Sequence, residues 1–160
     1  MSIEIGQSMP SATVYVMGDS GPESHETGQL FADKKTVLFA LPGAFTPTCS
    51  RSHLPGYIDQ FGAFAEKGVD QIICLSVNDA WVMDAWGKAQ GADGKVMMVG
   101  DGNGDLSREL GFLVDMSGAG FGERSIRYAM IIENGVVTHL NVEAPREFKI
   151  SDAETMLQLL

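Results

Sequence analysis

The chain has 160 residues, of which 44% are hydrophobic and 20% are charged, and its formal net charge is −10. This length suits a single domain over residues 1–160, and the composition is that of a globular chain and excludes a disordered one. The eleven Lys and Arg residues are scattered. Nucleic acid is therefore not expected as a partner, because a binder must neutralise phosphates with clustered basic side chains.

The N-terminal residues, the apolar runs and the two cysteines indicate the compartment and the cofactors to expect. The first six residues have neither a basic start nor an apolar core, and no apolar run approaches the ~20 residues of a membrane helix. Two cysteines without a Cys-x-x-Cys arrangement are too few for a disulfide scaffold or a structural zinc site. We therefore expect a cytoplasmic protein with reduced thiols, no metal, no cofactor and no membrane partner. A mature form that has lost a transit peptide would fit the same sequence.

The first half of the chain predicts strands followed by a helix. Residues 12–17 form a short strand pattern, residues 18–28 are polar and predict a turn or loop, and residues 36–41 are an apolar run typical of a buried strand. Apolar side chains then recur at helical spacing up to Lys67-Gly68, where glycine is expected to end the helix. Pro55-Gly56 is expected to separate a short first turn, which carries Cys49, from the main helix.

The second half adds strands, helices and one hairpin. Residues 72–77 and 96–99 predict buried strands, and Asn78-Asp79 predicts the cap of a helix over 80–89. Asn134-Gly135 lies between two apolar runs and is the strongest short-range hairpin signal in the chain. The other expected elements are a turn and helix cap over 101–105, a short helix from Asp105 to Gly111, hairpin strands over 126–132 and 136–142, and a closing helix that begins at residues 151–154.

This order of elements predicts an α/β fold with a mixed sheet that helices flank on both faces. Ligand chemistry in such sheets lies at the carboxyl ends of the strands. Cys49 falls at such an end, because it follows the strand over 36–41 after a turn that contains two prolines. A lone cysteine is more often a small buried hydrophobe than a reactive group. At the start of a helix, however, unpaired N–H groups and the helix dipole favour the thiolate.

The residues around this cysteine resemble a known family. Pro42, Thr46 and Cys49 reproduce the Pro-x-x-x-Thr-x-x-Cys signature of peroxiredoxins, and the string PGAFTPTCS with the following HLPG resembles the peroxiredoxin-5 (plant type II) subfamily. Further matches lie at residues 74–80, 123–128 and 141–143. The resemblance implies a thioredoxin-like fold and a homodimer. It also implies a peroxidase that reduces hydrogen peroxide and organic hydroperoxides through a cysteine sulfenic acid, which glutathione and glutaredoxin or thioredoxin then recycle.

Two other functions use the same cysteine. A redox-sensing protein could signal to a partner through this thiol without rapid turnover. A cysteine hydrolase could pair Cys49 with His53 four residues later, but no Asn or Asp that would orient the histidine is apparent. The sequence favours the peroxidase.

Three residues are expected to assist Cys49 in catalysis. The Thr46 hydroxyl is close enough in sequence to turn towards the sulfur and the peroxide, although it could equally cap the helix. Pro42 would shield the thiolate from water. Arg127 matches the arginine that serves the resembling family by holding the thiolate and the transition state. Arg124 lies three positions earlier, so on a regular strand the two arginines point to opposite faces, and at most one of them reaches Cys49 unless a bulge intervenes.

Cys74 is the possible resolving cysteine. Plant type II relatives have a cysteine at this place that is proposed to resolve the sulfenic acid, whereas the C-terminal cysteine of some animal relatives is missing here. Cys74 is expected roughly 10 Å below the sheet edge, since it lies three residues before the end of its strand. A disulfide needs Cα atoms within about 7 Å, so we predict that Cys74 is structural and that an external thiol resolves Cys49.

Overall fold

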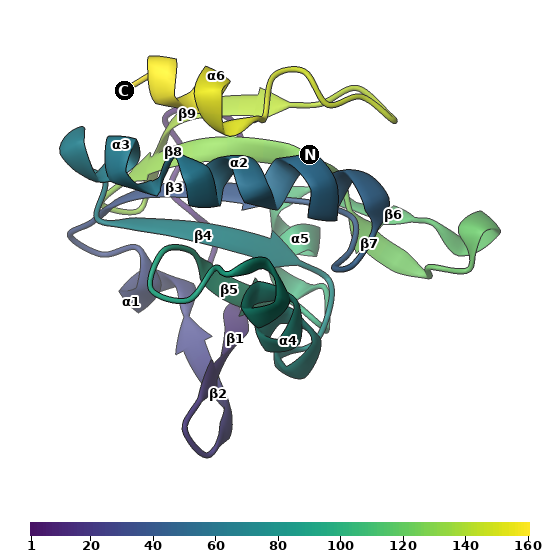
Figure 1. The fold of residues 1–160 in the computed structure, drawn as a ribbon. Helices are drawn as coiled ribbons and strands as arrows, with labels where there is room; N and C mark the ends of the chain where they lie inside the picture. Colours follow the sequence, from purple (N-terminus) through teal and green to yellow (C-terminus); the bar gives the residue numbers. More distant parts are fainter.

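The computed structural model describes residues 1–160, and the chain is built on a seven-stranded mixed sheet (Figure 1). The strand order is β2-β1-β5-β4-β3-β8-β9. Its strands are β1 (Thr13–Gly18), β2 (Gly21–Glu26), β3 (Lys35–Ala40), β4 (Gln71–Ser76), β5 (Met97–Gly100), β8 (Tyr128–Glu133) and β9 (Val136–Val142). β3, β4 and β5 are parallel, and all other pairs in this sheet are antiparallel. The expected α/β architecture with a mixed sheet is confirmed.

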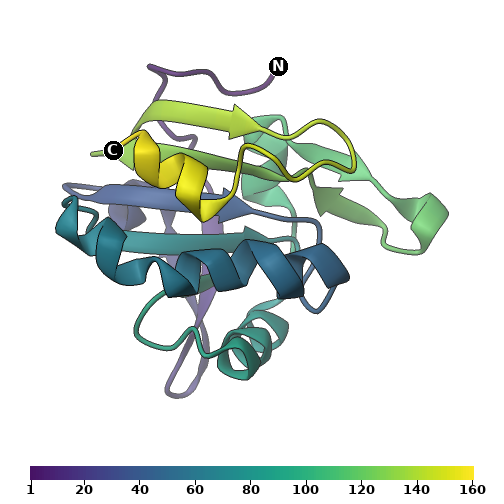
Figure 2. The same ribbon diagram turned by 45° about the horizontal axis from the view of Figure 1, so that its top comes forward.

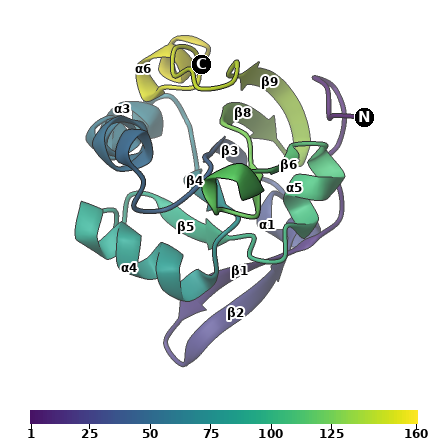
Figure 3. The same cartoon turned by 90° about the vertical axis from the view of Figure 1, so that its right-hand side faces the viewer.

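Helices lie on both faces of this sheet (Figure 3). One apolar cluster forms between the sheet and α2, α3, α4 and α6, and a second one forms with α1 and α5. Along β3, Val37 and Phe39 belong to the first cluster and Leu38 and Ala40 to the second, as the alternation of side chains in a strand requires. The helices are α1 (Thr27–Leu30), α2 (Leu54–Asp59), α3 (Phe61–Glu66), α4 (Ala80–Gln90), α5 (Asp105–Leu110) and α6 (Ala153–Gln158). No helix combines the length and the apolar character that a membrane span requires.

The helix that carries Cys49 runs without a break past Pro55. A π-helical segment, η1 (Cys49–His53), continues directly into α2, and the chain first leaves the helical conformation at Gln60 (Figure 2). The expected separation at Pro55-Gly56 was therefore wrong. Pro55 has no N–H and crowds the carbonyl one turn earlier. The wider π turn before it, in which the Leu54 N–H donates to the Cys49 carbonyl, accommodates a proline inside the helix.

Residues 18–28, which were expected to form a loop, contain a strand. β2 pairs with β1 in antiparallel register and α1 follows it directly. β2 is the edge strand of the sheet and most of its side chains are exposed. It therefore lacks the apolar alternation by which a half-buried strand is recognised.

A second, two-stranded sheet projects from the end of the main one (Figures 1 and 2). It is formed by β6 (Leu113–Asp115) and β7 (Glu123–Ser125), with the short 3-10 helix η2 (Ser117–Ala119) between them. The strand expected over 126–132 is present as β8, which begins at Tyr128 and ends at Glu133. Ile126 and Arg127 lie in the connection between the two sheets.

Several caps occur where the sequence predicts them. The Asp79 side chain accepts a hydrogen bond from Val82 N at the start of α4, and Gly68 and Gly111 take left-handed conformations after α3 and α5. Asp101 accepts hydrogen bonds from Leu106 N and Ser107 N, so it caps α5 as expected. The Asn134-Gly135 turn joins β8 to β9, with positive φ at both residues.

Candidate active site

The turn between β3 and the Cys49 helix is held by hydrogen bonds from both sides. Ala44 N donates to Asn78 Oδ1 over 3.0 Å, and Thr46 Oγ1 donates to the Gly43 carbonyl over 2.7 Å. Phe45 has a φ of 64°, a left-handed conformation that is unusual for a bulky residue, and its ring is 58% exposed. The turn therefore has a fixed shape that delivers the chain into the helix at the carboxyl end of β3.

Thr46 lies beside the cysteine but is not bonded to it. Its hydroxyl hydrogen is used on Gly43, while its carbonyl accepts from Ser50 N over 2.9 Å in the first helical turn. The Thr46 oxygen keeps free lone pairs and can accept a hydrogen bond from a bound molecule.

Cys49 is a free thiol, 1% exposed, at the start of the helix. Arg127 Nη2 lies 3.2 Å from its Sγ atom, within the range of a hydrogen bond to sulfur. A guanidinium is always protonated and acts only as a donor. The sulfur therefore has a fixed positive charge beside it, at the start of a helix.

The second nitrogen of the same guanidinium contacts a histidine. Arg127 Nη1 lies 2.7 Å from His53 Nδ1, and His53 Nε2 lies 3.0 Å from the Ser151 carbonyl. Since Arg127 only donates and a carbonyl only accepts, Nδ1 must be unprotonated and Nε2 must carry the hydrogen. Burial, followed by the charge of Arg127, lowers the pKa of His53 to about 3. The imidazole is therefore neutral at physiological pH.

Glu143 fixes the segment that this histidine contacts. Its carboxylate accepts hydrogen bonds from the backbone N–H groups of Lys149, Ile150 and Ser151 and from the Ser151 hydroxyl. Burial opposes ionisation of Glu143, but these hydrogen bonds outweigh it and hold the pKa of the carboxyl below its usual value. Glu143 N in turn donates to the Arg127 carbonyl over 3.0 Å.

Both arginines reach the cysteine turn, but only Arg127 reaches the sulfur. Arg124 Nη1 donates to the Pro42 carbonyl over 3.0 Å, in the space that the missing side chain of Gly43 leaves open. Only one of the two arginines reaches Cys49, as expected. The regular strand on which that expectation was based is absent, because the chain passes from β7 to β8 between the two residues.

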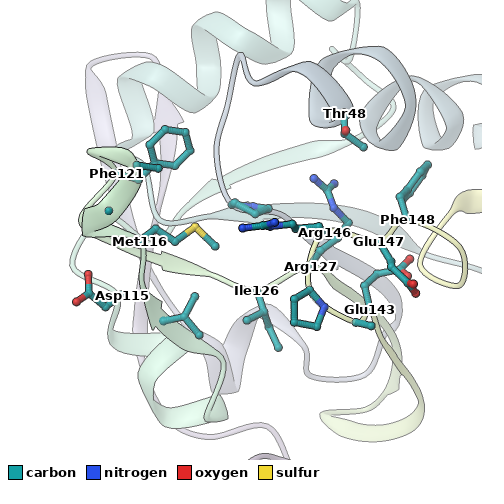
Figure 4. A pocket seen from close by; sticks show the side chains of 16 residues that line it. Thr48, Asp115, Met116, Phe121, Ile126, Arg127, Glu143, Arg146, Glu147 and Phe148 are labelled. Carbon is teal, nitrogen blue, oxygen red and sulfur yellow. The ribbon is translucent and has the colours of Figure 1, made fainter.

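A pocket of about 940 Å³ lies beside the helix that carries Cys49 (Figure 4). The connection between β6 and β7 forms one wall with Met116 and Phe121, and Phe148 lies on the opposite side. Pro42, Thr48 and Arg127 also line the pocket, whereas Cys49 does not.

Cys74 lies on the same face of the sheet as Cys49, inside the apolar cluster. It is fully buried in the middle of β4, where Phe39 and Met98 are its partners on the neighbouring strands. Burial, together with the nearby Cys49 sulfur, raises the pKa of the Cys74 thiol well above its usual value. This environment keeps Cys74 protonated and a poor nucleophile.

The sequence offered His53 only as a disfavoured hydrolase base, and it gave no sign that Glu143 and Ser151 belong to the same network. Both ring nitrogens of His53 have other partners, so the histidine does not act as the base of a cysteine hydrolase. Its helical spacing from Cys49 was the only signal in the sequence. The partners of His53 lie 74 and 98 positions away, and no periodicity or spacing rule connects them.

Comparison with known proteins gives a consistent picture. The Redoxin family model matches residues 4–157. The chain is 45% identical to peroxiredoxin-2E, chloroplastic, of Arabidopsis thaliana, over 99% of this chain and 70% of that protein. It is 42% identical to the hybrid peroxiredoxin hyPrx5 of Haemophilus influenzae, over 100% of this chain and 67% of that protein. The crystal structure of reduced Prx3 from Vibrio vulnificus in complex with hydrogen peroxide is 52% identical, covers 98% of both chains and superposes with a TM-score of 0.95.

Proposed function

The chain belongs to the peroxiredoxins, in their peroxiredoxin-5 or type II subfamily, and we propose that Cys49 is the nucleophile of its reaction. It is a thiol-dependent peroxidase that reduces peroxides. The observation that carries the assignment is the 3.2 Å contact between Arg127 Nη2 and Cys49 Sγ at the start of a helix. Cys74 has no comparable polar partner among its neighbours.

The proposed reaction is a displacement on oxygen. The Cys49 thiolate attacks one peroxide oxygen, an S–O bond forms, and the O–O bond breaks. The electron pair of the O–O bond leaves on the second oxygen, which takes a proton and departs as water or an alcohol. Sulfur is oxidised by two electrons to the sulfenic acid, and the peroxide is reduced by the same two electrons.

Three neighbours are proposed to assist this step. The Arg127 guanidinium would stabilise the thiolate and the negative charge that develops on the departing oxygen. The Thr46 oxygen would accept the hydrogen of the incoming peroxide, because its own hydrogen is already donated to Gly43. Pro42 lines the pocket and would keep water from the sulfur. Hydrogen peroxide and small organic hydroperoxides are the proposed substrates.

An external thiol is proposed to complete the cycle. Cys74 is buried in a strand and its pKa is raised, so it is a weak candidate for attack on the sulfenic acid. Glutathione would condense with the Cys49 sulfenic acid to a mixed disulfide and release water. A second thiol, from glutathione or glutaredoxin, would then attack the glutathione sulfur and release Cys49 as a thiol. Because Cys49 is buried and does not line the pocket, this step requires local opening of η1.

The test is peroxide consumption by the wild-type protein, with intact mass recorded after addition of peroxide and glutathione. We expect turnover with glutathione and glutaredoxin, and a single glutathione adduct that maps to Cys49. Absence of turnover with any thiol reductant, with one oxidised Cys49 per chain, would favour a redox sensor. A rapid loss of two hydrogens through a Cys49–Cys74 bridge that thioredoxin reduces would show that Cys74 resolves the sulfenic acid.

A homodimer is also proposed. Phe45, Trp81 and Phe121 are large hydrophobic side chains that are 58%, 64% and 38% exposed, and exposed aromatic groups are typical of contact surfaces. Phe121 also lines the pocket, so a second copy that packs there would border the site. Light scattering of the purified protein measures the mass directly, and a monomer at micromolar concentration would contradict the proposal.

A further inference from the structure

One arginine in the lining of the pocket has no partner in the chain. Arg146 lies in the segment between β9 and α6, is exposed, and lines the pocket together with Arg127. Figure 4 shows both arginines in the middle part of the lining, between Phe121 on one side and Phe148 on the other. The Arg146 guanidinium takes part in none of the ion pairs or side-chain hydrogen bonds of the structure. Its charge and its N–H donors are therefore available to a bound molecule.

The other charged side chains that line the pocket are already engaged. The Arg127 guanidinium is held between a sulfur and an imidazole. The carboxylates of Asp115, Glu143 and Glu147 accept hydrogen bonds from residues that follow them closely in the chain. A negatively charged ligand in this pocket therefore finds its unengaged counter-charge at Arg146.

The backbone of Arg146 has a conformation that favours glycine. Its φ is 66°, in the left-handed region, where a Cβ atom crowds the backbone and where glycine meets no such penalty. As far as the fold alone is concerned, glycine would suit this turn better than arginine. The arginine side chain gives the fold no hydrogen bond in return for this strain. Backbone outliers of this kind cluster at sites that bind or clamp ligands.

Much of the remaining lining of the pocket is apolar. The large apolar side chains are Val114, Met116, Phe121, Ile126 and Phe148. A volume of about 940 Å³ has room for an organic molecule much larger than hydrogen peroxide. Apolar walls with a few polar groups that orient the ligand are typical of small-molecule sites. The lining therefore fits an amphipathic anion, with an apolar body and one carboxylate.

We propose that Arg146 determines substrate specificity, by binding the carboxylate of organic hydroperoxides that carry this group on an apolar body. The proposal rests on the proposed function of Cys49 and names a substrate class for the same site. Arg127 lines the pocket and lies 3.2 Å from Cys49 Sγ, so a molecule bound there can present its peroxide group near the sulfur. One peroxide oxygen is transferred to sulfur, the O–O bond breaks, and the other oxygen takes a proton and leaves on the corresponding hydroxy acid. The carboxylate takes no part in the electron balance and serves only for binding.

Three variants separate the charge of Arg146 from the strain of its backbone. Arg146→Gln removes the charge and keeps a long side chain at positive φ. Arg146→Gly removes both the charge and the strain, so its midpoint of unfolding in urea should be higher than that of Arg146→Gln. Lys95→Gln is the matched control, because it removes one exposed positive charge from a residue that does not line the pocket.

The measured quantity is the second-order rate constant for oxidation of Cys49. It is compared for hydrogen peroxide, for hydroperoxides with a terminal carboxylate, and for the methyl esters of the same hydroperoxides. A chain with a net charge of −10 disfavours an anion in general, so a preference for the acid over its ester requires a local cation. We expect wild type to prefer the acid about fivefold, at the upper end for an exposed ion pair.

The variants should change this preference and little else. It should disappear in both Arg146 variants, remain in Lys95→Gln, and weaken as the ionic strength rises. The rate constant for hydrogen peroxide should stay within about twofold of wild type in all three variants, because hydrogen peroxide carries no carboxylate. Equal rate constants for acid and ester in wild type, or an equal loss of preference in Lys95→Gln, would overturn the proposal.

Binding of the hydroxy acid product gives a readout that does not depend on activity. Its titration, followed by NMR, should give saturable shifts in residues 144–148 of wild type and none in Arg146→Gln. Binding that persists in this variant would assign the carboxylate to Arg127 and overturn the proposal. Failure of the proposed function is distinguishable, since wild-type Cys49 would then react with no hydroperoxide while the titration still tests Arg146.

Glutathione also carries carboxylates, so the reductant is tested separately. The rate at which glutathione forms a mixed disulfide with oxidised Cys49 is measured in wild type and in Arg146→Gln. Similar rates, together with the lost preference for the acid, support the hydroperoxide as the ligand of Arg146. Slower formation of the mixed disulfide, with an unchanged ratio of acid to ester, would assign Arg146 to the reductant and overturn the proposal.

Discussion

The two buried cysteines lie in one apolar cluster, yet their surroundings prepare them for different chemistry. Cys49 starts a helix and has a guanidinium nitrogen 3.2 Å from its sulfur, whereas Cys74 lies in the middle of β4 between two other strands. Both side chains are almost completely shielded from solvent. Burial therefore does not decide which thiol reacts. The difference comes from the charged group that compensates for burial. Cys49 has such a group in Arg127, and Cys74 has none.

The largest difference should appear when each sulfur is removed in turn. Cys49→Ser should abolish peroxide consumption, because a serine hydroxyl cannot replace a thiolate as the nucleophile. Cys74→Ser should leave the first oxidation nearly intact, with one added oxygen on Cys49 after one equivalent of peroxide. Mass spectrometry of mapped peptides provides the measurement. An equal loss of activity in both variants would show that the two thiols work together.

The two arginines at the same turn offer the next comparison. Arg127→Gln should slow Cys49 oxidation about 100-fold or more, because it removes a donor to the developing charge. Arg127→Lys should recover little, since an ammonium group cannot bridge His53 and the sulfur as a planar fork does. Arg124→Gln should have a smaller effect, because Arg124 holds only the Pro42 carbonyl. Similar losses at both positions would mean that the shape of the turn matters more than the charge at sulfur.

We expect the free energy of unfolding to fall in acid, because His53 is buried in its neutral form beside Cys49. The pKa of His53 is about 3 in the folded chain, against about 6.5 for a free histidine. Between these values the unfolded chain binds a proton that the folded chain does not. The free energy of unfolding therefore falls as the pH decreases from 6.5 to 3, by at most about 1.4 kcal/mol per pH unit from this group.

Urea unfolding of wild type and His53→Asn at several pH values isolates this contribution. The stability difference between the two proteins should be largest at pH 7 and should narrow towards pH 4. Glu143 changes stability in the same direction, because its pKa is lowered in the folded chain, but it is present in both proteins and cancels. A difference that does not depend on pH would show that His53 is not buried in its neutral form.

The smallest expected effect is the change in stability caused by substitutions of Cys74. Cys74→Ser buries a hydroxyl inside the cluster and should lower the free energy of unfolding by roughly 1–3 kcal/mol. Cys74→Ala, which leaves a small cavity and no polar group, should cost less than the serine variant. Denaturant unfolding checks the order of the two. If serine were tolerated better than alanine, the strand would offer a polar partner and would be more open than its burial indicates.

The sequence predicted the local elements well, and its errors share a cause. The helix cap at Asp79, the turn at Asn134-Gly135 and the place of Cys49 at a helix start after β3 depend on neighbours within a few positions. β2 was missed because an exposed edge strand needs no apolar alternation. The helix break was misplaced because a π turn absorbed Pro55, and a wide turn has no signature of its own in the residue pattern.

Local sequence patterns were sufficient to predict the strand–turn–helix unit that presents Cys49 and the residue types available to it. Which distant groups reach the sulfur depends instead on how the chain packs. Arg127 lies between two sheets instead of inside one strand, and its partner His53 is 74 positions away. The anchor of His53 at Ser151 is 98 positions away. Helix and strand periodicities relate residues that are only a few positions apart in the sequence. The contacts of Arg127 and His53 arise instead when the sheet and its covering helices pack together.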